Sequence, residues 1–148
     1  MTQTLYTPIT LGKLQLKNRV AMAPMTRCRA TGNTPNELME KYYRQRSGAG
    51  LIITEGVANS ANGLGYARQP GLFTAEHVKG WKRVTDAVHA EGSKIFVQFM
   101  HTGRVSHPAN MLPGSKIVAP SAVAAPGEQW TDSSGQQPYP VPVAMNED

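Results

Sequence analysis

The stretch Val97-Gln-Phe-Met-His-Thr-Gly-Arg104 closes a short apolar run, which begins at Ile95, with a cluster of polar residues. Two earlier stretches have the same form, namely Arg19-Val-Ala-Met-Ala-Pro-Met-Thr-Arg27 and Gly50-Leu-Ile-Ile-Thr-Glu-Gly56. Nearly continuous apolar runs are typical of strands buried on both faces of a parallel sheet. The sequence therefore predicts three such strands, the first over residues 19–25, and in parallel barrels the functional residues gather at the carboxyl ends of the strands.

Two helical patterns lie between these strands. The box Thr34-Pro-Asn-Glu37, with proline at the first helical position, predicts a helix from residue 34 to about residue 47, ended by Gly48 and Gly50. Thr74 is a candidate N-cap of a second helix, which ends at Gly92 and has a predicted buried stripe of Val78, Trp81, Val84 and Val88. This alternation indicates an α/β fold, either a (β/α)8 TIM barrel or a doubly wound sheet.

The amino-terminal residues 1–18 predict a β-hairpin. Apolar residues alternate on both sides of a Gly12-Lys13 turn, at Ile9, Leu11, Leu14 and Leu16. Gly12 suits the turn position that needs a positive φ. We expect this hairpin to act as a lid that plugs the bottom of a barrel.

The composition changes abruptly after Arg104, because seven of the eleven prolines lie between Pro108 and Pro142. We expect residues 105–148 to form one long proline-rich loop after the third strand, with a short extended piece at residues 117–121 and no regular structure at 129–140. The last residues, 145–148, offer an N-cap candidate followed by two acids, as at the start of a helix. The chain is therefore interpreted as the amino-terminal portion of one barrel domain, the remainder of which is absent.

Length and composition exclude several classes of protein. A chain of 148 residues is too short for a complete eightfold barrel, which needs roughly 200 to 400. The single cysteine, Cys28, excludes a disulfide within the chain and indicates a reducing compartment. No signal peptide and no apolar run of about 18 residues is present, which predicts a cytoplasmic protein that does not enter a membrane.

The formal net charge of +5 and the isoelectric point of 9.6 raise the question of nucleic-acid binding. The basic residues alternate with acidic ones inside the two helical patterns, which favours solvated helix faces over a phosphate-binding surface. A fragment that lacks the acidic half of its parent would also be this basic. We therefore predict no nucleic-acid partner.

Three residues at the predicted strand ends suit a flat heterocyclic ligand. The carboxamide of Gln98 offers a donor and an acceptor that match the pyrimidine edge of a flavin, although a buried glutamine held by backbone groups fits its position equally well. Thr26 follows Pro24, which breaks the strand, so its hydroxyl is expected to point into the barrel mouth unless it is only structural. Gly56 permits close approach of a flat ligand or merely forms a turn.

Other polar residues near these ends have simpler interpretations. We interpret Glu55 as a buried charge paired with an arginine rather than as a catalytic acid. His101 and His107 are separated by five loop residues, a spacing that matches no common metal site, so no metal is predicted. Cys28 is expected to be a partly buried structural thiol.

Several ordered motifs extend over nearly the whole chain. They are Leu5-Tyr-Thr-Pro-Ile-Thr-Leu-Gly12, Lys17-Asn-Arg-Val-Ala-Met-Ala-Pro-Met-Thr-Arg27, Thr54-Glu-Gly56, Gly65-Tyr66, Pro70-Gly71, the Trp81 helix with His89-Ala-Glu91, Val97-Gln-Phe-Met-His-Thr-Gly-Arg-Val-Ser-His107 and Ala119-Pro-Ser121. Together they resemble the old yellow enzyme family of FMN-dependent ene reductases. The resemblance implies a (β/α)8 barrel that binds FMN and passes hydride from NAD(P)H through FMN to the activated C=C of α,β-unsaturated carbonyl compounds.

The resemblance also implies roles for individual residues. Pro24, Met25 and Thr26 would line the flavin, with the Thr26 hydroxyl near its C4 carbonyl, where it tunes the cofactor. Gly56 would contact the ring through its backbone, and Gln98 would bind its pyrimidine edge. Two residues match the substrate side in similar enzymes, Tyr66 and Met100, and the methionine replaces a tryptophan of several relatives, which leaves a wider pocket.

The family's substrate-carbonyl pair, proton-donating tyrosine and FMN phosphate loops all come later than residue 148, so no catalytic residue is predicted here. The chain alone is expected to be inactive and to pair with a complementary carboxyl-terminal barrel segment, or with itself, through open strand edges. Two alternatives stay open. One is a non-catalytic half-barrel or interaction module without flavin, and the other is a related barrel reductase with an iron–sulfur cluster.

Overall fold

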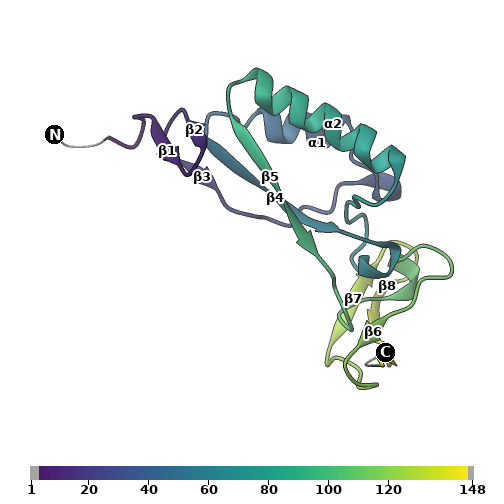
Figure 1. Ribbon diagram of the computed structural model, residues 1–148. Coiled ribbons are helices and arrows are strands. Elements are labelled where there is room, and N and C mark those ends of the chain that lie inside the picture. Colours follow the sequence, from purple (N-terminus) through teal and green to yellow (C-terminus); the bar gives the residue numbers. More distant parts are fainter. Residues whose placement is uncertain (1–3, 147–148) are drawn as a thin grey trace.

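The structure is a computed structural model that describes residues 4–146 (Figure 1). The strands are β1 (Ile9–Leu11), β2 (Leu14–Leu16), β3 (Ala21–Met22), β4 (Leu51–Ala58), β5 (Lys94–Met100), β6 (Val118–Ala119), β7 (Glu128–Thr131), β8 (Gly135–Pro138) and β9 (Val143–Ala144), and the α-helices are α1 (Glu37–Arg44) and α2 (Ala75–Ala90). Three short 3-10 helices cover Thr31–Asn33, Ala61–Gly63 and Pro108–Asn110. Neither α-helix within residues 4–146 combines the length and the apolar composition that crossing a membrane requires.

The centre of the fold is a parallel sheet of three strands in the order β3-β4-β5. Helices α1 and α2 lie together on one of its faces (Figure 1). The core forms between these layers, where Tyr43 and Trp81 from the helices meet Ile52 and Val57 from β4. This arrangement confirms the predicted α/β units, and within the described residues the sheet does not close into a barrel.

The first strand is shorter than predicted, because only Ala21–Met22 pairs with β4 instead of residues 19–25. Pro24 has no N–H to donate to the ladder, and the chain leaves the sheet just before it. The second strand is longer than predicted and runs through Gly56 to Ala58.

Strand β4 contains a β-bulge. Ile53 is opposite Phe96 and Gly56 is opposite Gln98, so β4 uses three steps where β5 uses two. The extra residue breaks the regular alternation of side chains. Ile52 and Glu55 therefore both reach α1, at the core and at the Tyr43 hydroxyl respectively.

The predicted N-cap is confirmed for α2 but not for α1. Thr74 caps α2 by accepting the N–H of His77, as predicted, and Gly92 follows the helix with a φ of 75°. The N-cap of α1 is Asn36, which accepts the N–H of Met39, so the predicted capping box at residue 34 is wrong. The predicted stripe of α2 holds except at Val78, which is 56% exposed.

Strands β1 and β2 form the predicted antiparallel hairpin, with Gly12 at a φ of 59°. Figure 1 shows it at the end of the parallel sheet where the strands begin. Its role as a barrel lid stays a prediction.

Residues 105–146 are more ordered than predicted. Strands β7 and β8 form an antiparallel hairpin over residues 128–138, so the expectation of no regular structure at 129–140 is wrong. Asn110 fixes this hairpin because its Nδ2 donates to the carbonyl groups of Gly65 and Trp130. The extended piece at residues 117–121 is confirmed as β6, which pairs in parallel with β9. The predicted helix start at residues 145–148 lies partly outside the described residues.

Candidate functional site

The carboxyl ends of the three parallel strands bring together the residues that the sequence singled out. Gly56 of β4 is directly opposite Gln98 of β5. Thr26 and Gly56 are each four residues beyond the paired residues Met22 and Ile52. Thr26 itself lies beyond the end of β3 and outside the ladder, but the next residue, Arg27, is held to β4 by its hydrogen bond to Glu55, the neighbour of Gly56.

Gln98 has an exposed side chain, so the alternative of a buried glutamine held by backbone groups is wrong. Its position is fixed through the main chain, because its N–H donates to Thr54 Oγ1 at 3.0 Å. That hydrogen bond replaces a ladder bond that the bulge of β4 removes. Residues Phe96, Gln98 and Met100 alternate along β5 and so share one face of the strand.

Gly56 is covered by Met100. A Cβ atom built on Gly56 would lie 2.7 Å from Met100 Cε and 2.8 Å from Met100 Sδ. The close approach explains why a residue without a side chain occupies this position. The contact also keeps the thioether of Met100 beside Gln98, on the same face of β5.

Pro24, Met25 and Thr26 lie in an exposed segment that follows β3. The next two residues are held by Glu55, whose Oε2 accepts the N–H of Arg27 at 3.0 Å and that of Cys28 at 2.9 Å. Two successive amides on one carboxylate oxygen fix the direction of the chain immediately after Thr26.

Glu55 is 1% exposed, and its remaining hydrogen bonds are to the hydroxyl of Tyr43. The Tyr43 hydroxyl donates to Glu55 Oε1 at 3.3 Å and accepts the N–H of Glu55 at 2.9 Å. Within the described residues no arginine forms an ion pair with Glu55, so the predicted arginine partner is wrong. Backbone amides take its place because the bulge turns this carboxylate toward the segment after β3.

The ionisable neighbours of Glu55 are held in their neutral forms. Burial, followed by the negative charge of Glu55, raises the pKa of the Tyr43 hydroxyl. Burial and then the same charge raise the pKa of the Cys28 thiol, which is partly buried as predicted. A thiol with a raised pKa is a poor nucleophile, so Cys28 is suited to packing rather than to catalysis.

Tyr66 is half-buried in the loop between β4 and α2. Burial, then the neighbouring Tyr139 and Cys28, raise the pKa of its hydroxyl. Its backbone N–H donates to Oε1 of Gln69, which also accepts the N–H of Gly65. Sequence reasoning missed Gln69 and Tyr139, because nothing in their local patterns indicates that they lie beside Tyr66.

The two histidines do not converge on a metal. Each Nδ1 accepts a nearby backbone N–H, that of Gly103 for His101 and that of Ala109 for His107. Residues 4–146 contain no group of three or more His, Cys, Asp or Glu side chains that could hold a metal ion.

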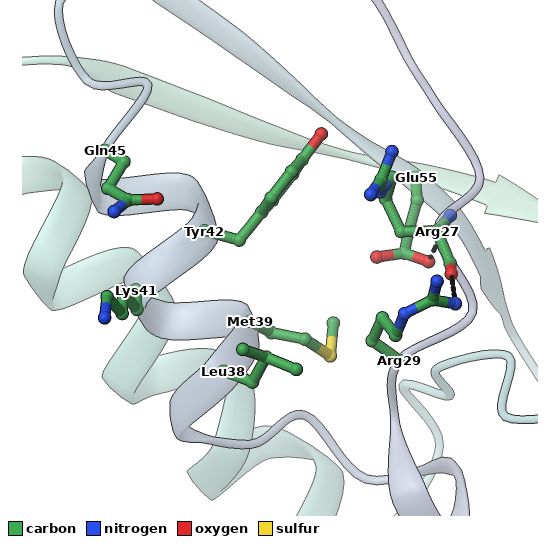
Figure 2. Close-up of a pocket in the computed structure, with 8 residues that line it drawn as sticks. All are labelled: Arg27, Arg29, Leu38, Met39, Lys41, Tyr42, Gln45 and Glu55. Atoms are coloured by element: carbon green, nitrogen blue, oxygen red, sulfur yellow. Dashed lines mark hydrogen bonds between the residues drawn. The ribbon is translucent and has the colours of Figure 1, made fainter.

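A cavity of about 270 Å³ lies on the helix side of the sheet, between α1 and the segment after β3. Figure 2 shows Tyr42, Met39 and Leu38 reaching from α1 toward Arg27, Arg29 and Glu55 on the opposite wall. Thr26, Gly56 and Gln98 do not line this cavity, but the chain neighbours Arg27 and Glu55 do.

Comparison with known proteins identifies relatives over almost the whole chain. The sequence pattern described as the NADH:flavin oxidoreductase / NADH oxidase family matches residues 4–147. The probable flavin mononucleotide-dependent alkene reductase of Leishmania infantum is 45% identical over 143 residues, which are 93% of this chain and 39% of that protein. The 12-oxophytodienoate reductase 7 of Oryza sativa subsp. japonica is 44% identical over 104 residues, 70% of this chain and 26% of that protein.

Solved structures of the same family are also similar to this chain. The old yellow enzyme homologue from Zymomonas mobilis has a TM-score of 0.89 and 43% identity, over 98% of this chain and 40% of that one. Morphinone reductase in complex with tetrahydroNAD has a TM-score of 0.87 and 43% identity, over 97% of this chain and 41% of that one. The chain thus spans about two fifths of these proteins. It belongs to the NADH:flavin oxidoreductase / NADH oxidase family, the family of old yellow enzyme, whose members use FMN with NAD(P)H as the reductant.

Proposed function

We propose that residues 1–148 form the amino-terminal, flavin-contacting portion of one FMN-binding (β/α)8 barrel domain with ene reductase activity. The observation that carries the proposal is the pairing of Gly56 with Gln98 on adjacent parallel strands, beside the segment after Thr26 that Glu55 holds. Chemistry gathers at the carboxyl ends of the strands in such barrels. Gly56 and Gln98 lie in the carboxyl-terminal halves of β4 and β5, and Thr26 lies in the segment that follows β3.

The residues present fit a flavin ring. The exposed carboxamide of Gln98 is free to pair with a ring that alternates carbonyl and N–H groups. Met100 covers Gly56 in this structure, so a planar group reaches the Gly56 backbone when that flexible side chain moves aside. Pro24 and Met25 add an apolar wall, and the Thr26 hydroxyl adds one donor. When bound, FMN supplies the hydride-transfer chemistry between NAD(P)H and the activated C=C of an α,β-unsaturated carbonyl compound.

Tyr66 and Met100 form the substrate side in this proposal. The Tyr66 hydroxyl, whose pKa burial raises further above neutrality, offers a hydrogen-bond donor toward a carbonyl oxygen. Met100 is unbranched and flexible, so it adapts to substrates of different shapes. Both residues bind and orient, and no residue of this chain is assigned the proton transfer.

The same proposal includes a complementary barrel segment. Strand β5 is an edge of the sheet, and its apolar side chains Phe96 and Phe99 are 47% and 54% exposed. An apolar parallel edge is a template for another strand. We propose that the barrel is completed there, with pairing of two copies of this chain as the rival arrangement. The single cysteine supports a cytoplasmic location.

The proposal is tested by supplying the missing portion. The probe is the part of the Zymomonas mobilis homologue that this chain does not match, called the unmatched fragment below. Absorbance in the flavin bands and NADPH oxidation with 2-cyclohexenone are measured for the chain, the fragment and their mixture, each with added FMN. We expect flavin retention and turnover in the mixture alone. Gln98→Ala should weaken FMN binding by about 1–3 kcal/mol, since two planar hydrogen bonds are lost.

A colourless, inactive mixture would support the rival reading of a half-barrel interaction module without flavin. Turnover by the chain alone would overturn the assignment of the missing steps to a complementary segment. Equal FMN affinity for wild type and Gln98→Ala would show that Gln98 is structural.

Thr26→Ala should make the bound flavin harder to reduce. A hydrogen bond to a group that gains charge contributes about 1.5–3 kcal/mol, which corresponds to a potential about 30–60 mV lower for a two-electron couple. Thr26→Ser keeps the hydroxyl and is the matched control. Spectroelectrochemical titration of the mixture measures the potential, and an unchanged or higher value in Thr26→Ala would reject this role.

A further inference from the structure

Two faces of helix α1 are already covered by this chain. Met39 and Tyr43 are buried in the core against the sheet. Glu40 faces α2, where it pairs with Arg83 at 3.6 Å. Both contacts are internal to the residues described, and they orient the rest of the helix.

A third face of α1 is uncovered. Leu38 and Tyr42 are each two residues from Glu40, which places them about 200° around the helix and away from α2. They line the cavity of about 270 Å³ that Figure 2 shows, opposite Arg27 and Arg29. Leu38 is 58% exposed, so this face is apolar as well as open.

The cavity is surrounded by positive charge. The guanidinium groups of Arg27 and Arg46 lie 5.3 Å and 3.6 Å from the centre of the Tyr42 ring. Arg29 and Lys41 also border the cavity. Within residues 4–146 none of these four cations forms an ion pair. We name this surface the basic face, comprising Arg27, Arg29, Leu38, Lys41, Tyr42 and Arg46.

Glu55, the acid that lines this cavity, does not neutralise the surrounding positive charge. Glu55 is buried, and its carboxylate accepts the two amides and the hydroxyl described above. The cavity lining thus contains one carboxylate and three cations, Arg27, Arg29 and Lys41, and of these Lys41 also borders Glu37 and Glu40 on its other side. The basic face attracts an acidic partner and repels a copy of itself, because like charges in contact oppose association.

The basic face lies beside the open edge of β3. Strand β3 pairs only with β4 among the described strands, and Arg27 and Arg29 lie in the segment that continues from its carboxyl end. When eight strand–helix units close into a barrel, the last strand pairs with the first and the last helix lies beside the first helix. The basic face is thus at the seam where closure occurs.

We infer that the basic face is the docking surface for the closing strand–helix unit of the barrel, and that this unit presents carboxylates to the arginines and apolar side chains to Leu38 and Tyr42. The inference rests on the proposed function, since both need a complementary segment. It adds which surface that segment occupies and which chemistry it carries.

The test measures binding of the unmatched fragment without FMN, by isothermal titration calorimetry at low and high NaCl concentration. The variant Arg27→Glu/Arg29→Glu should raise Kd at least tenfold at low salt, and high salt should shrink the difference. The matched control, Lys79→Glu/Lys116→Glu, changes the net charge equally at exposed sites away from the cavity and should stay within twofold of wild type.

Arg29 also donates to the carbonyl oxygens of Arg27 and Cys28, so its replacement could alter the loop itself. A second variant separates this effect from the loss of charge. Lys41→Glu disturbs no such contact in the described residues and should raise Kd severalfold, with an unaltered circular dichroism spectrum.

Three outcomes overturn the inference. They are failure of the wild-type chain to bind the fragment, equal binding by the charge-reversed variants, and self-association of the chain that the same variants abolish. A yellow, active mixture whose assembly ignores the charge reversal would leave the flavin proposal standing and reject this docking surface alone.

Discussion

Replacing Glu55 with alanine is expected to lower the free energy of unfolding of this chain by about 2–4 kcal/mol, because each hydrogen-bonding group left without a partner costs about 1–3 kcal/mol. The change removes the acceptor of the Arg27 and Cys28 amides and one partner of the Tyr43 hydroxyl. Urea denaturation followed by far-UV circular dichroism measures the loss.

Glu55→Gln is the matched control. Both amides bond to the same oxygen of Glu55, so a glutamine whose carbonyl takes that place keeps both bonds. We expect a loss of about 1 kcal/mol, from the weaker bonds of a neutral acceptor. If alanine and glutamine destabilise equally, the acceptor oxygen is not what holds the segment after β3.

Gly50→Ala is the second substitution with a large expected effect. A Cβ atom at residue 50 would lie 2.4 Å from the backbone oxygen of Asn18 and 3.0 Å from its Oδ1. The same Oδ1 accepts the N–H of Gly50 at 2.7 Å and that of Val20 at 3.1 Å. Overpacking against main chain that cannot move aside lowers the free energy of unfolding by about 1–3 kcal/mol. Because the hydrogen bonds of Asn18 are strained as well, we expect a total loss of about 3 kcal/mol.

Gly48→Ala is its control, since nothing lies within 4 Å of a Cβ atom at residue 48. Alanine there should leave stability unchanged or raise it by about 0.4–1 kcal/mol through the unfolded chain. The same denaturation measurement compares the two variants. Equal effects at residues 48 and 50 would mean that both glycines only end the helix.

Short-range signals in the sequence predicted much of the fold. The N-cap at Thr74, the turn at Gly12 and the buried stripe of Trp81, Val84 and Val88 are all in the structure. Each depends on residues within one or two turns of chain, so the local pattern contains the information.

The errors occur where distant parts of the chain compete with a local signal. Pro35 suits the first position of a helix, yet a Cβ on Gly80 would lie 2.5 Å from its carbonyl oxygen. Pro35 therefore packs against α2, and the helix begins after Asn36. Likewise, the proline-rich stretch forms the hairpin of β7 and β8, because Asn110 and Thr131 satisfy its backbone groups.

The candidate site divides in the same way. The local sequence indicated the chemistry of Thr26, Gly56 and Gln98. Parallel pairing of β4 and β5 brings Gly56 opposite Gln98, whereas the segment after Thr26 is held by hydrogen bonds to Glu55. The partners of Glu55 could not be predicted locally, because the bulge in β4 turns its carboxylate toward the backbone amides of Arg27 and Cys28 instead of an arginine. Gln69 and Tyr139 were missed because they reach Tyr66 only through the folded loops.

The sequence by itself determined the alternation of strands and helices, the amino-terminal hairpin and the resemblance to old yellow enzyme, since periodicity, caps and motifs are local. The tertiary structure alone decided that Glu55 holds the segment after Thr26, that Gly50 but not Gly48 must lack a side chain, and that arginines from outside α1 gather around its Tyr42. The decisive contacts join residues 28 positions apart for Arg27 and Glu55 and 32 apart for Asn18 and Gly50. Such residues meet only once β3 and β4 have paired, so no window along the chain reveals them.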